Sequence, residues 1–86
     1  MREFERLFKA LANRRRLTLV HYLKDHRQAT VGELAAMLRL SFSATSRHLA
    51  LLAAVDLVES EQRGLQVYYR LGAVERKLRH AISTIC

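Results

Sequence analysis

The segment after Leu40 carries the side chains with the clearest potential for chemistry. Ser41 opens a stretch of small and hydroxyl-bearing residues, and Arg47 follows within the same stretch. A serine caps a helix well, and small side chains in a first turn let another molecule approach the free backbone N–H groups. Arginine adds a planar fork that fits both a phosphate and a guanine edge. This pattern is typical of a helix that enters the major groove of DNA, and we predict contacts from Ser41, Phe42, Ser43, Ala44, Ser46, Arg47 and His48.

A second group of candidate contacts lies around Gly64. Arg63 places a cation directly before this flexible position, and Gln66 follows it. A cation beside a turn suits a phosphate or the minor groove, so Arg63 and Gln66 join the predicted DNA contacts. The alternative is that Arg63 is a solvated turn residue.

Several of these residues have two alternative roles. Phe42 either touches a thymine methyl group or packs inward against the preceding helix. His48 either contacts a phosphate or packs as a polar residue. The cationic run 14–16 either holds flanking phosphates or is solvated, and Arg16 is a candidate for a structural ion pair.

Other chemistries are poorly supported. The chain has no glycine-rich phosphate loop and no nucleophile elbow, so we do not expect an enzyme. The four histidines are scattered, and we predict neither a cofactor nor a metal site. His80 and Cys86 lie six residues apart, so they do not share a helix face and approach each other only across a dimer axis. A single cysteine excludes an intrachain disulfide and fits a reducing cytosol.

Four helices are expected to position the candidate residues. Apolar residues at spacings of three and four predict the first helix over roughly 2–12. Asn13 is a good cap for a second helix that runs to about Asp25. Residues 26–29 are expected to form a loop. Thr30 and Glu33 have the spacing of a capping box that starts the third helix, and Ser41 caps the fourth, over 42–55.

The apolar pattern assigns an inward face to three of these helices. In the second helix it consists of Leu17, Val20 and, with less support from the pattern, His21 and Leu23; in the third, Leu34, Met37 and Leu38; in the fourth, Thr45, Leu49, Leu52 and Val55.

Beyond Asp56 the pattern changes to two β-rich runs, 57–62 and 65–71, around Arg63 and Gly64, which indicates a hairpin. Gly72 ends the second run, and apolar residues between Val74 and Ile85 mark one face of a final helix. The predicted fold is therefore mostly α with a small β-hairpin, in the order α-α-α-α-β-β-α: a helix-turn-helix followed by a wing.

The bulk composition limits the class of protein. Eighty-six residues form one domain, 1–86, and half of them are hydrophobic. A net charge of +7 favours a polyanionic partner, above all nucleic acid. No apolar run approaches the roughly 20 residues of a membrane span, and the N-terminus lacks a signal-peptide pattern, so we expect a cytoplasmic protein without membrane contact.

Short motifs in a fixed order also carry a family likeness. They are 11–17 (LANRRRL), 31–35 (VGELA), 40–41 (LS), 46–49 (SRHL), 57–58 (LV) and 64–71 (GLQVYYRL). Together they resemble the ArsR/SmtB family of winged helix-turn-helix repressors over about residues 4–72. The resemblance implies a homodimer that packs through its first and last helices, with the fourth helix in the major groove and the wings on flanking DNA.

The chain departs from the metal-sensing members of that family. Their Cys-x-Cys pair corresponds here to Thr30 and Gly32, which supply no thiolate. The last helix carries His80 and Glu75 without the spacing of the other common metal site. Phe42 replaces a usually polar residue, and Asn13-Arg14 replaces a common Asp-Pro. The resemblance thus supports the fold more strongly than metal sensing.

The sequence therefore predicts a homodimeric transcriptional regulator, a repressor that binds a pseudo-palindromic operator in double-stranded DNA. Two alternatives stay open: a metal- or thiol-responsive sensor repressor of the same fold, and a winged-helix protein-interaction module that does not bind DNA. The sequence does not identify an inducer.

Overall fold

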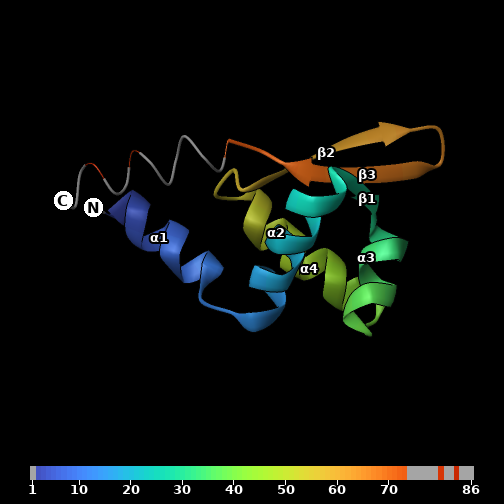
Figure 1. Cartoon of the computed structure of the whole chain (residues 1–86), viewed down its shortest axis with the longest axis horizontal. Coiled ribbons are helices and arrows are strands. Elements are labelled where there is room, and N and C mark those ends of the chain that lie inside the picture. Colours follow the sequence, from blue (N-terminus) through green and yellow to red (C-terminus); the bar gives the residue numbers. More distant parts are fainter. Residues whose placement is uncertain (1, 74–79, 81–82, 84–86) are drawn as a thin grey trace.

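The computed structural model describes residues 2–73, 80 and 83. Its elements run in the order α1 (Arg2–Leu11), α2 (Arg14–His26), β1 (Gln28–Thr30), α3 (Val31–Leu38), α4 (Phe42–Ala53), β2 (Val58–Arg63) and β3 (Gln66–Leu71). Helices α2, α3 and α4 lie on one side of the sheet, while α1 and the β2–β3 turn occupy opposite ends (Figure 1). Most of the final helix predicted over 74–85, and the dimer contact assigned to it, fall outside the described residues.

Helix α2 begins as the sequence predicts, but its buried face matches the predicted one only in part. The Asn13 side chain accepts hydrogen bonds from the backbone N–H groups of Arg15 and Arg16, at 3.0 and 3.2 Å. Leu19 and Leu23 are buried, whereas Leu17 is 50% exposed and His21 is exposed. The predicted inward face is therefore wrong for Leu17 and His21, whereas Leu23 is buried and Val20 packs against the core as predicted. At about 100° per residue, Leu17 lies roughly 200° around the helix from Leu19, so both leucines cannot face the core.

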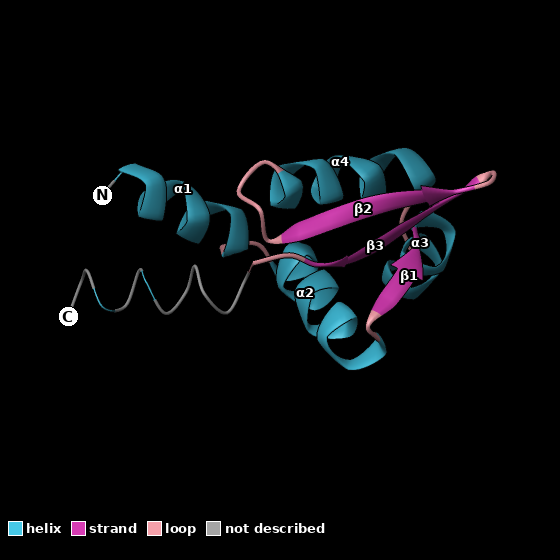
Figure 2. Ribbon diagram, turned by 90° about the horizontal axis from the view of Figure 1, so that it is seen from above, coloured by secondary structure: helices cyan, strands magenta, loops and turns pink. Residues whose placement is uncertain are grey.

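The sheet has three antiparallel strands in the order β1-β3-β2, instead of the predicted two (Figure 2). Residues 28–30, assigned to a loop in the prediction, form β1 and pair with β3, with Ala29 opposite Tyr69. Ala29 is 2% exposed. A strand of three residues is too short to show an alternating pattern, so the sequence gives no signal for it.

The β2–β3 hairpin confirms the predicted wing. Its last pair is Arg63 with Gln66, so Gly64 and Leu65 form a two-residue turn. Gly64 has a φ of 62°, while Leu65 does not have a positive φ, which is the arrangement of a type II′ turn with glycine first. Gly72 follows β3, and a Cβ there would lie 2.6 Å from the carbonyl oxygen of Asp56, so only glycine fits this close approach.

One apolar core joins the helices to the sheet. Its most deeply buried side chains come from α2, α3, α4 and the residue before β2, and they are Leu19, Leu23, Leu34, Thr45, Leu49, Leu52 and Leu57. Tyr69 packs against this cluster, whereas Tyr68 pairs with Glu61 and Thr30 on the other face of β3. The core therefore fixes the inward face of α4 and leaves its opposite face outward.

Candidate nucleic-acid interface

The two helices before the wing are joined by a turn with closely defined ends. Thr30 accepts the backbone N–H of Glu33 at 3.1 Å, and the Glu33 carboxylate accepts the backbone N–H of Thr30 at 2.9 Å. Hydrogen bonding of the Glu33 carboxylate to the Thr30 backbone N–H, and to the Thr30 side chain, lowers the pKa of Glu33 below its ordinary value. The predicted capping box is thus confirmed. Thr30, which matches a metal-sensor cysteine by position, serves here as a helix cap.

The turn itself is set by Arg39. This residue has a φ of 56°, and its backbone N–H donates to the carbonyl of Ala36 at 3.2 Å. The N–H of Leu40 donates to the carbonyl of Ala35 at 3.1 Å. The pair of bonds forms a Schellman motif, which ends α3 sharply and fixes the direction in which α4 begins.

Ser41 caps α4 as predicted. Its hydroxyl oxygen accepts the backbone N–H of Ala44 at 3.1 Å, and the Thr45 hydroxyl donates to the Ser41 carbonyl at 2.9 Å. The helix ends at Ala53, two residues before the predicted boundary at 55. Asp56 adopts a φ of 62°, and the chain closes there into a second Schellman motif instead of continuing as a helix.

The outward face of α4 carries most of the predicted contact residues. Ser43 and Arg47 are exposed and lie four residues apart, so they share a face. Ala44 and Ser46 are half-buried beside them, whereas Thr45, Leu49 and Leu52 are fully buried, as predicted. Phe42 is 63% exposed, so it does not pack inward against α3.

His48 lies at the edge of this face and contacts α2. Its Nδ1 is 3.3 Å from an Nη1 of Arg16, and the Nε–H of Arg16 donates to the carbonyl of Ala10 at 2.5 Å. Arg16 therefore makes hydrogen bonds to the His48 ring and to a backbone carbonyl, and the structural ion pair expected for it is not present among the described residues. Partial burial lowers the pKa of His48, and the nearby guanidinium groups of Arg16, Arg15 and Arg47 lower it further.

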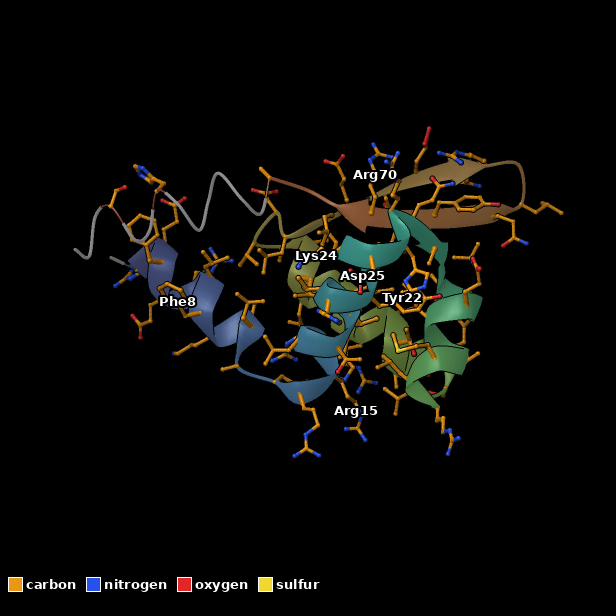
Figure 3. All side chains as sticks on the ribbon, viewed as in Figure 1. Phe8, Arg15, Tyr22, Lys24, Asp25 and Arg70 are labelled. Atoms are coloured by element: carbon orange, nitrogen blue, oxygen red, sulfur yellow. The ribbon has the colours of Figure 1, made fainter. Side chains whose placement is uncertain are left out.

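Arg14 and Arg15 are exposed, and their side chains have no ion-pair partner in the described part of the chain. Arg15 points away from the core at the lower edge of Figure 3, and it is close enough to affect the His48 ring electrostatically. The amino end of α2 and the outward face of α4 thus contribute cations to one region of the surface.

The outer face of the wing carries a network of paired charges. Arg63 reaches the Glu61 carboxylate at 2.8 Å and the Gln28 side-chain oxygen at 3.0 Å, and its guanidinium lies 4.7 Å from the Tyr68 ring centroid. Arg70 contacts Glu61 as well, at 3.3 Å. Hydrogen bonding to Arg63, together with its charge, lowers the pKa of Glu61. Arg63 is therefore held by partners that the sequence did not indicate.

Around that network, Arg70 also contacts Glu59, at 2.8 Å, and projects from the sheet on the side away from the helices (Figure 3). Gln66 is exposed at the wing turn, beside Arg63. Arg63 and Arg70 share the Glu61 carboxylate, and this sharing could have been suspected only from strand register. Glu59 and Glu61 lie two residues apart on β2, but the sequence alone does not show which β3 residues lie beside them.

No group of three or more histidine, cysteine, aspartate or glutamate side chains that could hold a metal occurs in the parts of the chain that the structure describes. Cys86 and Glu75, considered for a site with His80, lie outside those parts. Among the described helices, none is long and apolar enough to cross a membrane.

Residues 13–60, more than half of the chain, match the family described as bacterial regulatory protein, arsR family. The chain belongs to this family. It is a family of regulators and not of enzymes.

The named relatives include both a transcriptional activator and a repressor. The chain is 44% identical over 71 residues to the transcriptional activator HlyU of Vibrio cholerae, covering 83% of this chain and 65% of HlyU. It is 32% identical over 75 residues to the arsenical resistance operon repressor of Bacillus subtilis, covering 87% of this chain and 71% of the repressor.

The solved structures agree on the fold. A structure of Vibrio cholerae HlyU superposes with a TM-score of 0.80 at 39% identity, covering 93% of this chain and 86% of that one. The homodimeric winged helix-turn-helix DNA-binding domain of a possible ArsR-family regulator from Mycobacterium bovis superposes with a TM-score of 0.79 at 28% identity, covering 96% and 77%. The winged helix-turn-helix fold predicted from the sequence is confirmed.

Proposed function

We propose that this chain is a homodimeric, sequence-specific DNA-binding repressor. The observation that carries the proposal is the outward face of α4, where Ser43 and Arg47 are exposed beside a capped helix N-terminus. Family membership and the homodimeric DNA-binding domain among the similar structures support the same function. Repression follows by occlusion, because a dimer on an operator blocks access to the duplex beneath it.

The proposed contacts divide into two kinds. Arg47 reads a base edge, because its fork can bind the two acceptors of guanine, and Phe42 touches a thymine methyl group. Ser41, Ser43 and Ser46 donate to phosphates or bases, Ala44 allows close approach, and His48 contributes a donor. Arg63 and Gln66 of the wing contact flanking backbone or minor groove. Arg14 and Arg15 add phosphate attraction, which supplies affinity by releasing counterions.

A selection from random duplexes tests this proposal. The purified full chain should enrich a sequence with two inverted half-sites about one helical turn apart, roughly 10 base pairs centre to centre, since a two-fold dimer presents two α4 helices. Binding to the enriched duplex should weaken steeply as salt rises from about 50 to 200 mM. Failure to enrich or shift any duplex at low salt would favour the interaction module without DNA binding.

The sign of regulation needs a separate measurement, since the named relatives include an activator and a repressor. A promoter with the enriched site overlapping its polymerase-binding region should be transcribed less in vitro when the protein is added. A rise in transcript from that template would identify an activator and contradict occlusion. A template with a scrambled site is the control.

A further inference from the structure

Arg16 joins three helices through two hydrogen bonds. It lies in the first turn of α2, donates from Nε to the carbonyl of Ala10 in the last turn of α1, and donates from Nη1 to Nδ1 of His48 on α4. The guanidinium group has five N–H donors and no acceptor. The Nδ1 atom of His48 must therefore be the acceptor in this contact.

That assignment fixes the tautomer of the ring. A neutral imidazole carries one proton, so an accepting Nδ1 places the proton on Nε2. The Nε2 atom has no hydrogen-bond partner among the described residues. Because the described side chains include no buried polar atom without a partner, and His48 is only half-buried, this Nε2–H must be accessible to solvent.

The surroundings of the ring favour its uncharged form. Arg15 and Arg16 face it from α2 and Arg47 faces it from its own helix, and their positive charges add to the effect of burial in lowering the His48 pKa. At neutral pH the ring is thus a neutral donor surrounded by cations that attract phosphate.

We propose that Arg16 is a positioning residue, which holds His48 as a neutral Nε2–H donor to a hydrogen-bond acceptor on duplex DNA. The inference rests on the proposed DNA-binding function and adds the tautomer and the residue that sets it. The acceptor is a phosphate oxygen or an acceptor on a base edge, both of which take a single N–H. Arg16 also donates a hydrogen bond to Ala10 of α1. The position of the His48 donor therefore depends on how α1 lies relative to α4.

The free protein gives a test that needs no DNA. Ring nitrogen NMR at pH 7.5 should show His48 as the neutral tautomer protonated at Nε2. In Arg16→Met, which keeps the aliphatic stem and removes both donors, the His48 resonances should show tautomer exchange and a pKa closer to the ordinary value. A charged or Nδ1-protonated ring in the wild-type protein at this pH would overturn the inference, even if DNA binding stands.

The DNA test uses the duplex obtained by selection. His48→Leu should lose about 3- to 10-fold in affinity, the effect of one neutral hydrogen bond. His48→Gln keeps a distal N–H donor and should stay within about 2-fold of wild type. Neither variant disturbs the bond from Arg16 to Ala10, so both remain informative if Arg16→Met is poorly folded, which thermal unfolding would report. Equal affinity of His48→Leu and wild type would overturn the proposal.

A double-mutant cycle tests whether Arg16 acts through His48. If it does, Arg16→Met combined with His48→Leu should bind about as well as His48→Leu alone, whereas fully additive losses would contradict a positioning role.

Modified duplexes separate the two classes of acceptor. Methylphosphonate substitution removes charge from a backbone phosphate, and 7-deazaguanine removes an acceptor from a base edge. The modification at the true acceptor should weaken binding by the wild-type protein and leave binding by His48→Leu unchanged. Equal sensitivity of both proteins to every modification would contradict the proposed contact between His48 and DNA.

Discussion

Phe42 exposes 63% of its surface at the first turn of α4. The sequence left two positions open for this ring, because an aromatic residue after a helix cap suits either the core or a ligand. The structure places it outward because Thr45, Leu49 and Leu52 already fill the inward face of the helix. An aromatic ring beside a predicted DNA-reading face is chemically suited to the methyl group of thymine.

This placement predicts a position in the operator where the thymine methyl group matters. Replacing that thymine with deoxyuridine should weaken wild-type binding about 3- to 4-fold, since a buried methylene contributes about 0.8 kcal/mol. Phe42→Ala should bind the two duplexes equally. Competition binding with the paired duplexes measures the difference, and the same methyl effect in both proteins would exclude Phe42 as the reader.

At the scale of elements, patterns with direct local causes were predictable and those set by tertiary pairing were not. Ser41 and the Thr30–Glu33 pair were found because a cap needs only neighbouring residues. Strand β1 was missed because its formation depends on β3, some forty positions away in the chain. The contact between Arg16 and His48 was equally hidden, since it depends on how α2 crosses α4.

In the wing, strand register determines which side chains Arg63 contacts. Arg63 was predicted as a contact to DNA, and in the structure its guanidinium is shared between Glu61 and Gln28. Register places Glu61 opposite Tyr68 and Glu59 opposite Arg70, which brings both carboxylates to the same face as Arg63. A phosphate approaching Arg63 must therefore compete with Glu61.

This competition predicts that Glu61→Gln binds duplex DNA more tightly, by about 2- to 5-fold at low salt, the range expected for an exposed ion pair. Glu59→Gln is the matched control, since it removes the same charge but releases Arg70 and not Arg63. Fluorescence anisotropy on selected and random duplexes would measure both. Equal gains from the two variants would attribute the effect to net charge and not to the release of Arg63.

The whole molecule combines an excess of cations with an uneven distribution of them. The chain has a net charge of +7, yet the wing arginines Arg63 and Arg70 are paired with carboxylates. Arg14, Arg15, Arg39 and Arg47 have exposed side chains with no ion-pair partner in the described regions. General attraction to DNA from α2, from the turn after α3 and from α4 should therefore exceed that from the wing until the ion pairs of the wing open.

The position of α1 in the whole molecule bears on the proposed dimer. Helix α1 projects from the end opposite the wing and leaves Phe8 39% exposed, which agrees with the proposed pairing through the first helix (Figure 3). The proposed dimer has twice the cationic surface of one chain and is expected to present two copies of α4 to one duplex. Sequence preference should then depend on Arg47, while affinity for any duplex should depend on the total charge.

The most direct measurement is the ratio of affinities for the selected duplex and a random duplex at one fixed salt concentration. Arg47→Ala should reduce this ratio by about 5- to 100-fold, the discrimination expected from one bidentate base contact. Arg63→Ala should weaken binding to both duplexes by a similar factor, and Lys24→Ala, which removes an exposed charge on α2, should likewise leave the ratio unchanged. If Arg47→Ala instead weakened both duplexes equally, as Arg63→Ala is expected to do, base reading by the outward face of α4 would be contradicted.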